Sequence, residues 1–219
     1  RPDESRLDLI DRNVAIFRRI LRDIQQLALP KECILVVISN PVDILTYIAA
    51  KEAVFPPERV IGLGTMLDTL RFRSLIGCKF SIDPRQVNAL MLGEHGDSMV
   101  PVQSTASVNG APVTGLAGYS DRTWKELVEQ ARHAGAEVLR KKGGAGYAVA
   151  VAAVQVIRSI VLDERAVLPV STLQRGYLGM KDVCLSIPTI VGRNELEHAP
   201  PTLWPREERA LKHSAEVLH

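Results

Sequence analysis

The sequence predicts an α/β protein in which a parallel sheet is followed by a larger α+β region. The run Cys33 to Ile38 holds six apolar residues without polar alternation, which is typical of a parallel strand buried on both faces. A second short strand is expected at Val60–Gly64, one helix-sized interval later. Asn109-Gly110 then gives a strong hairpin signal between two strand-like segments. These observations predict a helix–strand–helix–strand region followed by a part with antiparallel pairing.

The remaining elements follow from periodicity and turn signals. The chain opens on an amphipathic helix whose apolar residues recur at helical spacing, namely Ile10, Val14, Phe17 and Leu21. Beyond residue 85 we expect strands at 86–92, 100–108 and 111–113, helices at 121–142 and 147–163, strands at 166–174 and 183–191, and a helix from about 205. We therefore expect two domains, residues 1–65 and 66–219.

Composition narrows the class of protein. The 219 residues are 46% hydrophobic and 24% charged with a net charge of +2, which predicts a globular protein without a strong attraction to nucleic acid or membrane. The three cysteines, Cys33, Cys78 and Cys184, lie far apart. We expect them to be reduced core residues of a cytoplasmic protein, with no metal site and no disulfide framework.

The segment Leu92 to Ser98 is the strongest candidate for chemistry, because it places His95 between two glycines after an apolar run. A histidine can exchange a proton near neutral pH, and a carboxylate such as Asp68 can orient its ring. Arg71 follows Asp68 by one helical turn and offers a planar fork for a substrate carboxylate. Taken alone, Asp68 and Arg71 could be a surface ion pair and His95 an ordinary loop histidine. Their joint occurrence favours an active site.

Ser39 and Asn40 follow the first predicted strand. Ligands of open α/β sheets bind just beyond the carboxyl ends of such strands. Ser39-Asn40-Pro41 is also typical of a helix-capping turn, and the two interpretations are compatible.

Several motifs in one order give the chain its resemblance to a known family. They are Glu4-Ser5-Arg6-Leu7-Asp8-Leu9, Ser39-Asn40-Pro41-Val42-Asp43-Ile44-Leu45-Thr46-Tyr47, Val60-Ile61-Gly62, Leu67-Asp68, Arg71-Phe72-Arg73, Gly93-Glu94-His95-Gly96-Asp97-Ser98, Pro169-Val170-Ser171-Thr172 and Asp182-Val183-Cys184-Leu185-Ser186-Ile187-Pro188. The chain resembles the L-lactate/malate dehydrogenase family from residue 1 nearly to its end, and its L-lactate members most. The resemblance implies the second part of a dinucleotide-binding (Rossmann) sheet followed by an α+β substrate domain.

The resemblance also implies an activity and its residues. The reaction would be hydride transfer between NAD and a small 2-oxo or 2-hydroxy acid. His95 would exchange the proton with Asp68 as its partner, and Arg71 would bind the substrate carboxylate. Arg6, on a closing loop, would polarise the reacting carbonyl, and Asn40 would contact substrate and cofactor.

Further implications concern the cofactor, the pocket and the assembly. Ile38 and Ser39 would line the nicotinamide ribose, and Ala145 stands where lactate dehydrogenases commonly carry a threonine over the substrate. Members of the family form homo-oligomers, usually tetramers. No G-x-G-x-x-G occurs, and the family's phosphate loop and main substrate-selecting residue would precede Arg1, so we expect the chain to be part of a longer enzyme. A malate dehydrogenase of the lactate-dehydrogenase-like type and an inactive fragment acting as an interaction module remain the alternatives.

Overall fold

The computed structural model describes residues 6–52, 55–143, 146–194 and 196–219. The helices are α1 (Arg6–Gln25), α2 (Val42–Glu52), α3 (Met66–Phe80), α4 (Asp121–Lys142), α5 (Gly146–Val161) and α6 (Pro205–Glu216). The strands are β1 (Leu35–Val37), β2 (Val60–Gly62), β3 (Val87–Leu92), β4 (Val100–Val108), β5 (Ala111–Pro112), β6 (Ala166–Arg175), β7 (Lys181–Val191) and β8 (Glu197–His198).

Two sheets organise these elements. The larger has the strand order β1-β2-β6-β7-β8, in which β1 and β2 are parallel and every other pair is antiparallel. The smaller is the antiparallel sheet β3-β4-β5. A bridge between Gly93 and Ser186 ties the end of β3 to β7. The parallel pair is therefore continuous with the later hairpin, and the two sheets meet where the candidate histidine follows β3.

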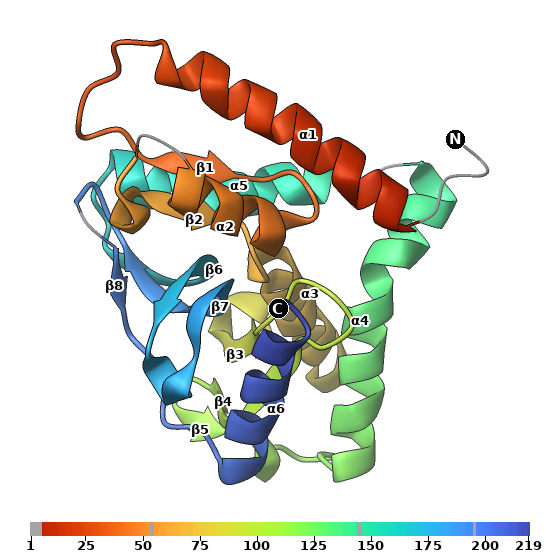
Figure 1. Cartoon of the computed structure of the whole chain (residues 1–219). Helices are drawn as coiled ribbons and strands as arrows, with labels where there is room; N and C mark the ends of the chain where they lie inside the picture. Colours follow the sequence, from red (N-terminus) through yellow and green to blue (C-terminus); the bar gives the residue numbers. More distant parts are fainter. Residues whose placement is uncertain (1–5, 53–54, 144–145, 195) are drawn as a thin grey trace.

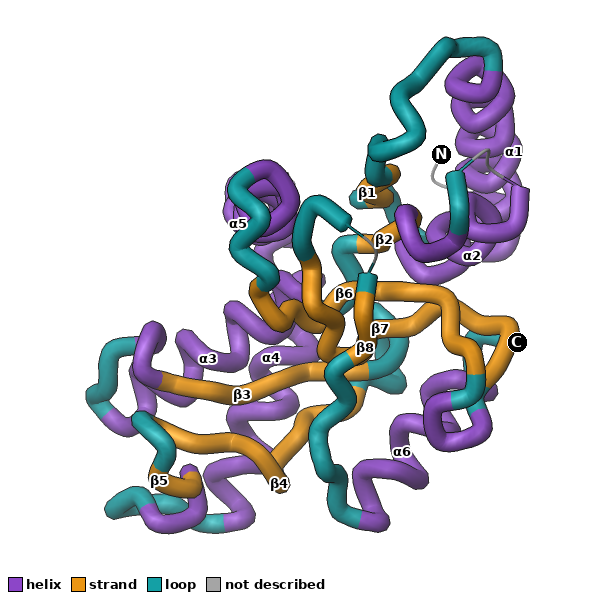
Figure 2. Tube along the Cα trace, turned by 90° about the vertical axis from the view of Figure 1, so that its left-hand side faces the viewer, coloured by secondary structure: helices purple, strands orange, loops and turns teal. Residues whose placement is uncertain are grey.

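Helices cover the sheets on several sides. Figure 1 shows α1 lying across α2 and β1 at one end of the molecule, with α4 and α6 toward the other end. Figure 2 shows α3 and α4 alongside the sheet β3-β4-β5. One core fills the space between these elements, where Phe72 of α3 meets Trp124 of α4 edge to face at 5.1 Å between ring centroids. None of the helices in the described part combines the length and apolar character needed to cross a bilayer.

Close packing of α2 against β2 depends on a glycine. A Cβ atom at Gly62 would lie 2.2 Å from Oγ1 of Thr46 and 3.0 Å from Cβ of Ser171. The Thr46 hydroxyl donates instead to the carbonyl of Val42, one turn earlier in α2. The missing side chain thus lets the start of α2, including Asp43, approach the sheet.

The later elements agree closely with the sequence-based expectations. Strand β4 and helix α4 have the predicted bounds, and Asn109 and Gly110 form the hairpin turn with φ values of 46° and 84°. Helix α5 begins at Gly146 rather than 147, and the short strand β8 was not predicted. Between α4 and α5, the break expected at 143–146 includes residues 144 and 145, which lie outside the described residues.

Two expectations are wrong. The apolar run 33–38 forms only the three-residue strand β1, and Ile38 exposes 40% of its surface. Within the described residues β1 pairs with β2 alone, and Leu35 and Val36 are half-buried while Val37 is buried, so the run is not fully buried on both faces. Cys78 is also exposed, because the end of α3 turns it away from the core, whereas Cys33 is half-buried and Cys184 is buried.

Candidate active site

The His95 side chain is held by a buried carboxylate. Its Nδ1 lies 2.7 Å from Oδ2 of Asp68, whose side chain is only 4% exposed. Burial lowers the pKa of His95, but the hydrogen bond and the negative charge of Asp68 outweigh it and hold that pKa above its usual value. Because Nδ1 is engaged, Nε2 is the ring nitrogen left for a substrate.

Asp68 lies beside His95 because two threonines fix the first turn of α3. The Thr65 hydroxyl donates to the Met91 carbonyl at 2.5 Å, and the Thr65 amide donates to Oγ of Ser186 at 2.9 Å. Oγ1 of Thr69 accepts from the Met91 amide at 3.0 Å. These bonds join the start of α3 to the end of β3 and to β7, so the carboxylate and the histidine are placed by neighbouring contacts.

The segment 93–98 that carries His95 is fastened to two other elements. Gly93 exchanges backbone hydrogen bonds of 2.8 and 2.9 Å with Ser186 of β7. The Glu94 amide donates to Oγ of Ser214 on α6 at 2.8 Å, and the Glu94 carboxylate accepts from the Ser98 hydroxyl at 2.5 Å. A Cβ atom at Gly93 would lie 2.5 Å from Oγ of Ser214, so the close approach of α6 requires a glycine there. We refer to residues 93–98 as the histidine loop.

Arg71 lies one turn along α3 from Asp68, and its terminal nitrogen is 3.7 Å from Oδ1 of that carboxylate. Its side chain is 16% exposed. Across from it on α4, a Cβ atom at Gly135 would lie 3.3 Å from the guanidinium, so this glycine leaves room for the arginine. The structure thus brings His95, Asp68 and Arg71 together, as the sequence predicted.

A cavity of about 620 Å³ adjoins the histidine loop. It is lined by Ile10, Asn13, Asn40, Pro41, Val42, Asp43, Ile44, Glu94, His95, Val217, Leu218 and His219. Oδ1 of Asn40 accepts from the Val42 amide at 3.3 Å, and the Asn40 carbonyl accepts from the Asn13 side chain at 3.1 Å. Asn40 therefore caps α2 and lines the cavity, which unites the two interpretations of the Ser39-Asn40-Pro41 turn.

Family models match almost the whole chain. Residues 1–62 match the NAD-binding domain of lactate/malate dehydrogenases, and residues 65–219 match the α/β C-terminal domain of the same enzymes. The chain belongs to the lactate/malate dehydrogenase family.

Individual members of the family are similar over the full chain. An L-lactate dehydrogenase of Salinibacter ruber is 42% identical over 99% of this chain and 70% of its own length, and one of Gloeobacter violaceus is 42% identical over 100% and 67%. Among solved structures, the minor L-lactate dehydrogenase of Enterococcus mundtii in its ligand-bound form has a TM-score of 0.95 at 34% identity, covering 100% of this chain and 70% of that one.

The family uses NAD, and the residues after β1 fit one end of it. Ile38 is apolar yet 40% exposed, and Ser39 and Asn40 are exposed beside it. A hollow of about 400 Å³ adjoins Ser39 and Asn40. An exposed apolar side chain with two polar neighbours at the carboxyl end of a parallel strand suits a flat ring and its sugar. Whether Ile38, Ser39 and Asn40 contact the nicotinamide and its ribose stays a prediction.

Two residues suggested by the resemblance lie at or beyond the limits of the described structure. Arg6 is the first residue of α1, and its side chain is not among those described. Ala145 lies outside the described residues. Their roles stay predictions.

One residue of the site was not singled out from the sequence. Asp43, in the first turn of α2, is 4% exposed, and its Oδ2 accepts the backbone N–H of His95 at 2.7 Å. Burial raises the pKa of Asp43 to about 6. The sequence signal for Asp43 was a single acidic residue within the apolar stretch that opens α2. The helix dipole alone already explains an acidic residue in the first turn of a helix.

Proposed function

We propose that the protein reduces a 2-oxo acid to the L-2-hydroxy acid, and catalyses the reverse reaction, with NAD as cofactor and pyruvate and L-lactate as the preferred pair. The observation that carries this proposal is the 2.7 Å bond between Asp68 and Nδ1 of His95, which leaves Nε2 to exchange a proton with the substrate oxygen. The similarity to L-lactate dehydrogenases of other organisms supports the choice of substrate.

Each residue has a defined part in the proposed reaction. NADH, when bound, supplies the hydride that adds to the carbonyl carbon. His95 donates the proton that the carbonyl oxygen takes up, and Asp68 stabilises the imidazolium before that transfer. Arg71 binds the substrate carboxylate through its two-pronged guanidinium. Asn40 hydrogen-bonds substrate and cofactor, and Arg6 polarises the carbonyl.

The proposal also covers the oligomeric state of the enzyme and its cellular compartment. We infer a homo-oligomer, in line with the tetramer that the resemblance implies, because α1 and α5 expose apolar side chains such as Ile16, Ile20, Val154 and Ile157. The free cysteines favour a reducing compartment such as the cytoplasm. Light scattering on the purified protein measures its oligomeric state.

The proposed substrate can be tested against its dicarboxylic analogue. We expect kcat/KM with NADH to be about a hundredfold higher for pyruvate than for oxaloacetate, because a second carboxylate in a closed pocket is costly without a partner cation. Arg71 would already bind the carboxylate that pyruvate and oxaloacetate share, and the carboxylates of Asp43 and Glu94 line the adjoining 620 Å³ cavity. Steady-state kinetics with both acids measure the ratio. A higher kcat/KM for oxaloacetate would favour the malate-type alternative, and turnover of neither acid would favour the interaction module.

Replacing Arg71 by lysine tests the carboxylate site. We expect KM for pyruvate to rise about tenfold or more with a smaller change in kcat, because a point charge does not reproduce the bidentate contact. The matched control is Arg85→Lys, since the Arg85 side chain is 89% exposed and pairs with Asp83 away from the site. An unchanged KM in Arg71→Lys would remove Arg71 from the substrate site.

A further inference from the structure

Asp43 is a buried carboxylate whose bonding is incomplete. Its Oδ1 is buried and has no hydrogen-bond partner among the described residues, and the same holds for Oγ of Ser171. The Ser171 hydroxyl lies close enough to lower the pKa of Asp43, but the two atoms do not reach hydrogen-bonding geometry. A carboxylate kept for stability alone is expected to have both oxygens satisfied.

Glu207 provides the comparison within the same chain. It is also 4% exposed, and its Oε1 accepts the amides of Gln103 and Ser104 while its Oε2 accepts the amide of Trp204. Both oxygens of Glu207 therefore serve the structure. Asp43 accepts one backbone N–H, and the donor is His95, the histidine of the proposed reaction.

The bond connects two separate parts of the molecule. Asp43 belongs to α2, which packs on the sheet containing β6 and β7, whereas His95 follows β3 of the other sheet. Asp68 holds the ring of His95 from α3, and Asp43 holds its backbone from α2. Two carboxylates thus meet one histidine from different helices.

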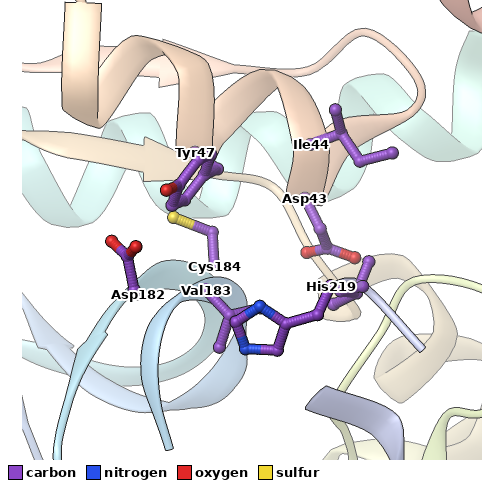
Figure 3. Close-up of a pocket in the computed structure, with 8 residues that line it drawn as sticks. Asp43, Ile44, Tyr47, Asp182, Val183, Cys184 and His219 are labelled. Atoms are coloured by element: carbon purple, nitrogen blue, oxygen red, sulfur yellow. The ribbon is translucent and has the colours of Figure 1, made fainter. Parts of the chain in front are cut away.

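The surroundings of Asp43 leave its charge only partly screened by water. Figure 3 shows Asp43 and Ile44 on one side of a small pocket, with Val183 and Cys184 opposite. The titratable groups that face Asp43 are His95 and Glu94 from the histidine loop, Tyr47 on α2, Cys184 and Asp182 on β7, and His219. Of these, His95 is the one whose positive charge acts on the Asp43 carboxylate in the proposed reaction.

We propose that Asp43 is a second positioning residue for His95, which fixes the backbone of the histidine loop and places an additional negative charge beside the imidazolium. Its role in turnover rests on the proposed function, whereas its effect on His95 does not. Asp68 would set the orientation of the ring, and Asp43 would set the position of the loop that carries it.

The test follows the His95 ring directly by NMR in protein labelled with ¹³C-histidine. Of the five histidines, the His95 signal is assigned by its loss in His95→Gln. In Asp43→Asn an amide oxygen can still accept the His95 N–H, but the charge is gone, so we expect the pKa of His95 to fall, although less than in Asp68→Asn. Glu207→Gln, a buried carboxylate elsewhere, is expected to leave that titration unchanged.

Kinetics separate the two parts of the proposed role. With pyruvate and NADH, Asp43→Asn is expected to lower kcat up to about tenfold with little change in KM. Because His95 must be protonated to reduce pyruvate, the alkaline limb of the pH profile should move to lower pH together with the pKa of His95. Asp43→Ala also removes the acceptor of the His95 N–H, and we expect a loss of about a hundredfold from the displaced loop.

The outcomes distinguish this proposal from the proposed function. A His95 titration in Asp43→Asn that matches wild type would overturn the positioning role, whatever the protein reduces. A lowered pKa of His95 in a protein that turns over neither pyruvate nor oxaloacetate would support the positioning role and reject the proposed function. If Asp43→Ala does not fold, the titration in Asp43→Asn still decides.

Discussion

Replacing Asp68 by asparagine is expected to lower kcat for pyruvate reduction by about 10²- to 10⁴-fold while leaving the affinity for an unreactive pyruvate analogue nearly unchanged. The carboxylate lies 2.7 Å from Nδ1 of His95 and is 4% exposed, so little solvent screens its charge. An amide can hold the ring, but it neither stabilises the imidazolium nor selects the tautomer with a proton on Nδ1. Stopped-flow and steady-state rates with NADH measure the effect.

The control for this variant is Asp83→Asn. Asp83 caps the turn at residues 84–86 and pairs with Arg85 on the surface, so its replacement should leave kcat unchanged. An Asp68→Asn enzyme that kept the wild-type kcat would show that His95 does not depend on this carboxylate.

Replacing Asp43 by asparagine is expected to stabilise the protein at pH 8, by about 3 kcal/mol, and to change little at pH 4. Burial raises the pKa of Asp43 from its usual value of 3.8 to about 6. Between these two values the native state binds more protons than the unfolded state, so wild-type stability falls as the pH rises through this window. An asparagine does not ionise and does not lose that stability. Urea unfolding of both proteins at pH 4 and pH 8 measures the difference.

Asp83 supplies a comparison of opposite sign. Its hydrogen bonds to Arg85 lower the pKa of Asp83 to about 2, so its stabilising contribution is present above pH 3.8 and is lost as the pH falls toward 2. Asp83→Asn should therefore weaken the protein slightly at pH 8, where Asp43→Asn strengthens it. Equal free energies of unfolding for wild type and Asp43→Asn at pH 8 would contradict the raised pKa. An Asp43→Asn protein that is more stable than wild type but has a lower kcat would show that Asp43 serves the active site at a cost in stability.

The elements that the sequence predicted well are those whose signals are local. Asn109-Gly110 adopts the positive φ values that its turn demands, and β4 and α4 on either side of this region follow directly from their own periodicity. Strand β1 differs because the burial of an apolar run depends on which elements pack on the two faces of its sheet. That coverage is a property of the whole fold, which a window of six residues does not contain.

The residues of the candidate site also fall into those that the sequence predicted and those that it did not. His95, Asp68 and Arg71 were predicted because side-chain chemistry and helical spacing are visible in the sequence. Asp43 was not, because its partner is a backbone N–H 52 positions away, and every residue carries such a group except proline. Likewise Ser214 gives no hint in the sequence that it supports the histidine loop.

The bond from Glu94 to Ser214 has a consequence for biosynthesis. The two residues are 120 positions apart, so on the ribosome the loop bearing His95 emerges long before the serine that fastens it. Contacts of such separation form late and slow the search for the native state. In a nascent chain the loop bearing His95 therefore lacks this bond until α6 has been translated and docked.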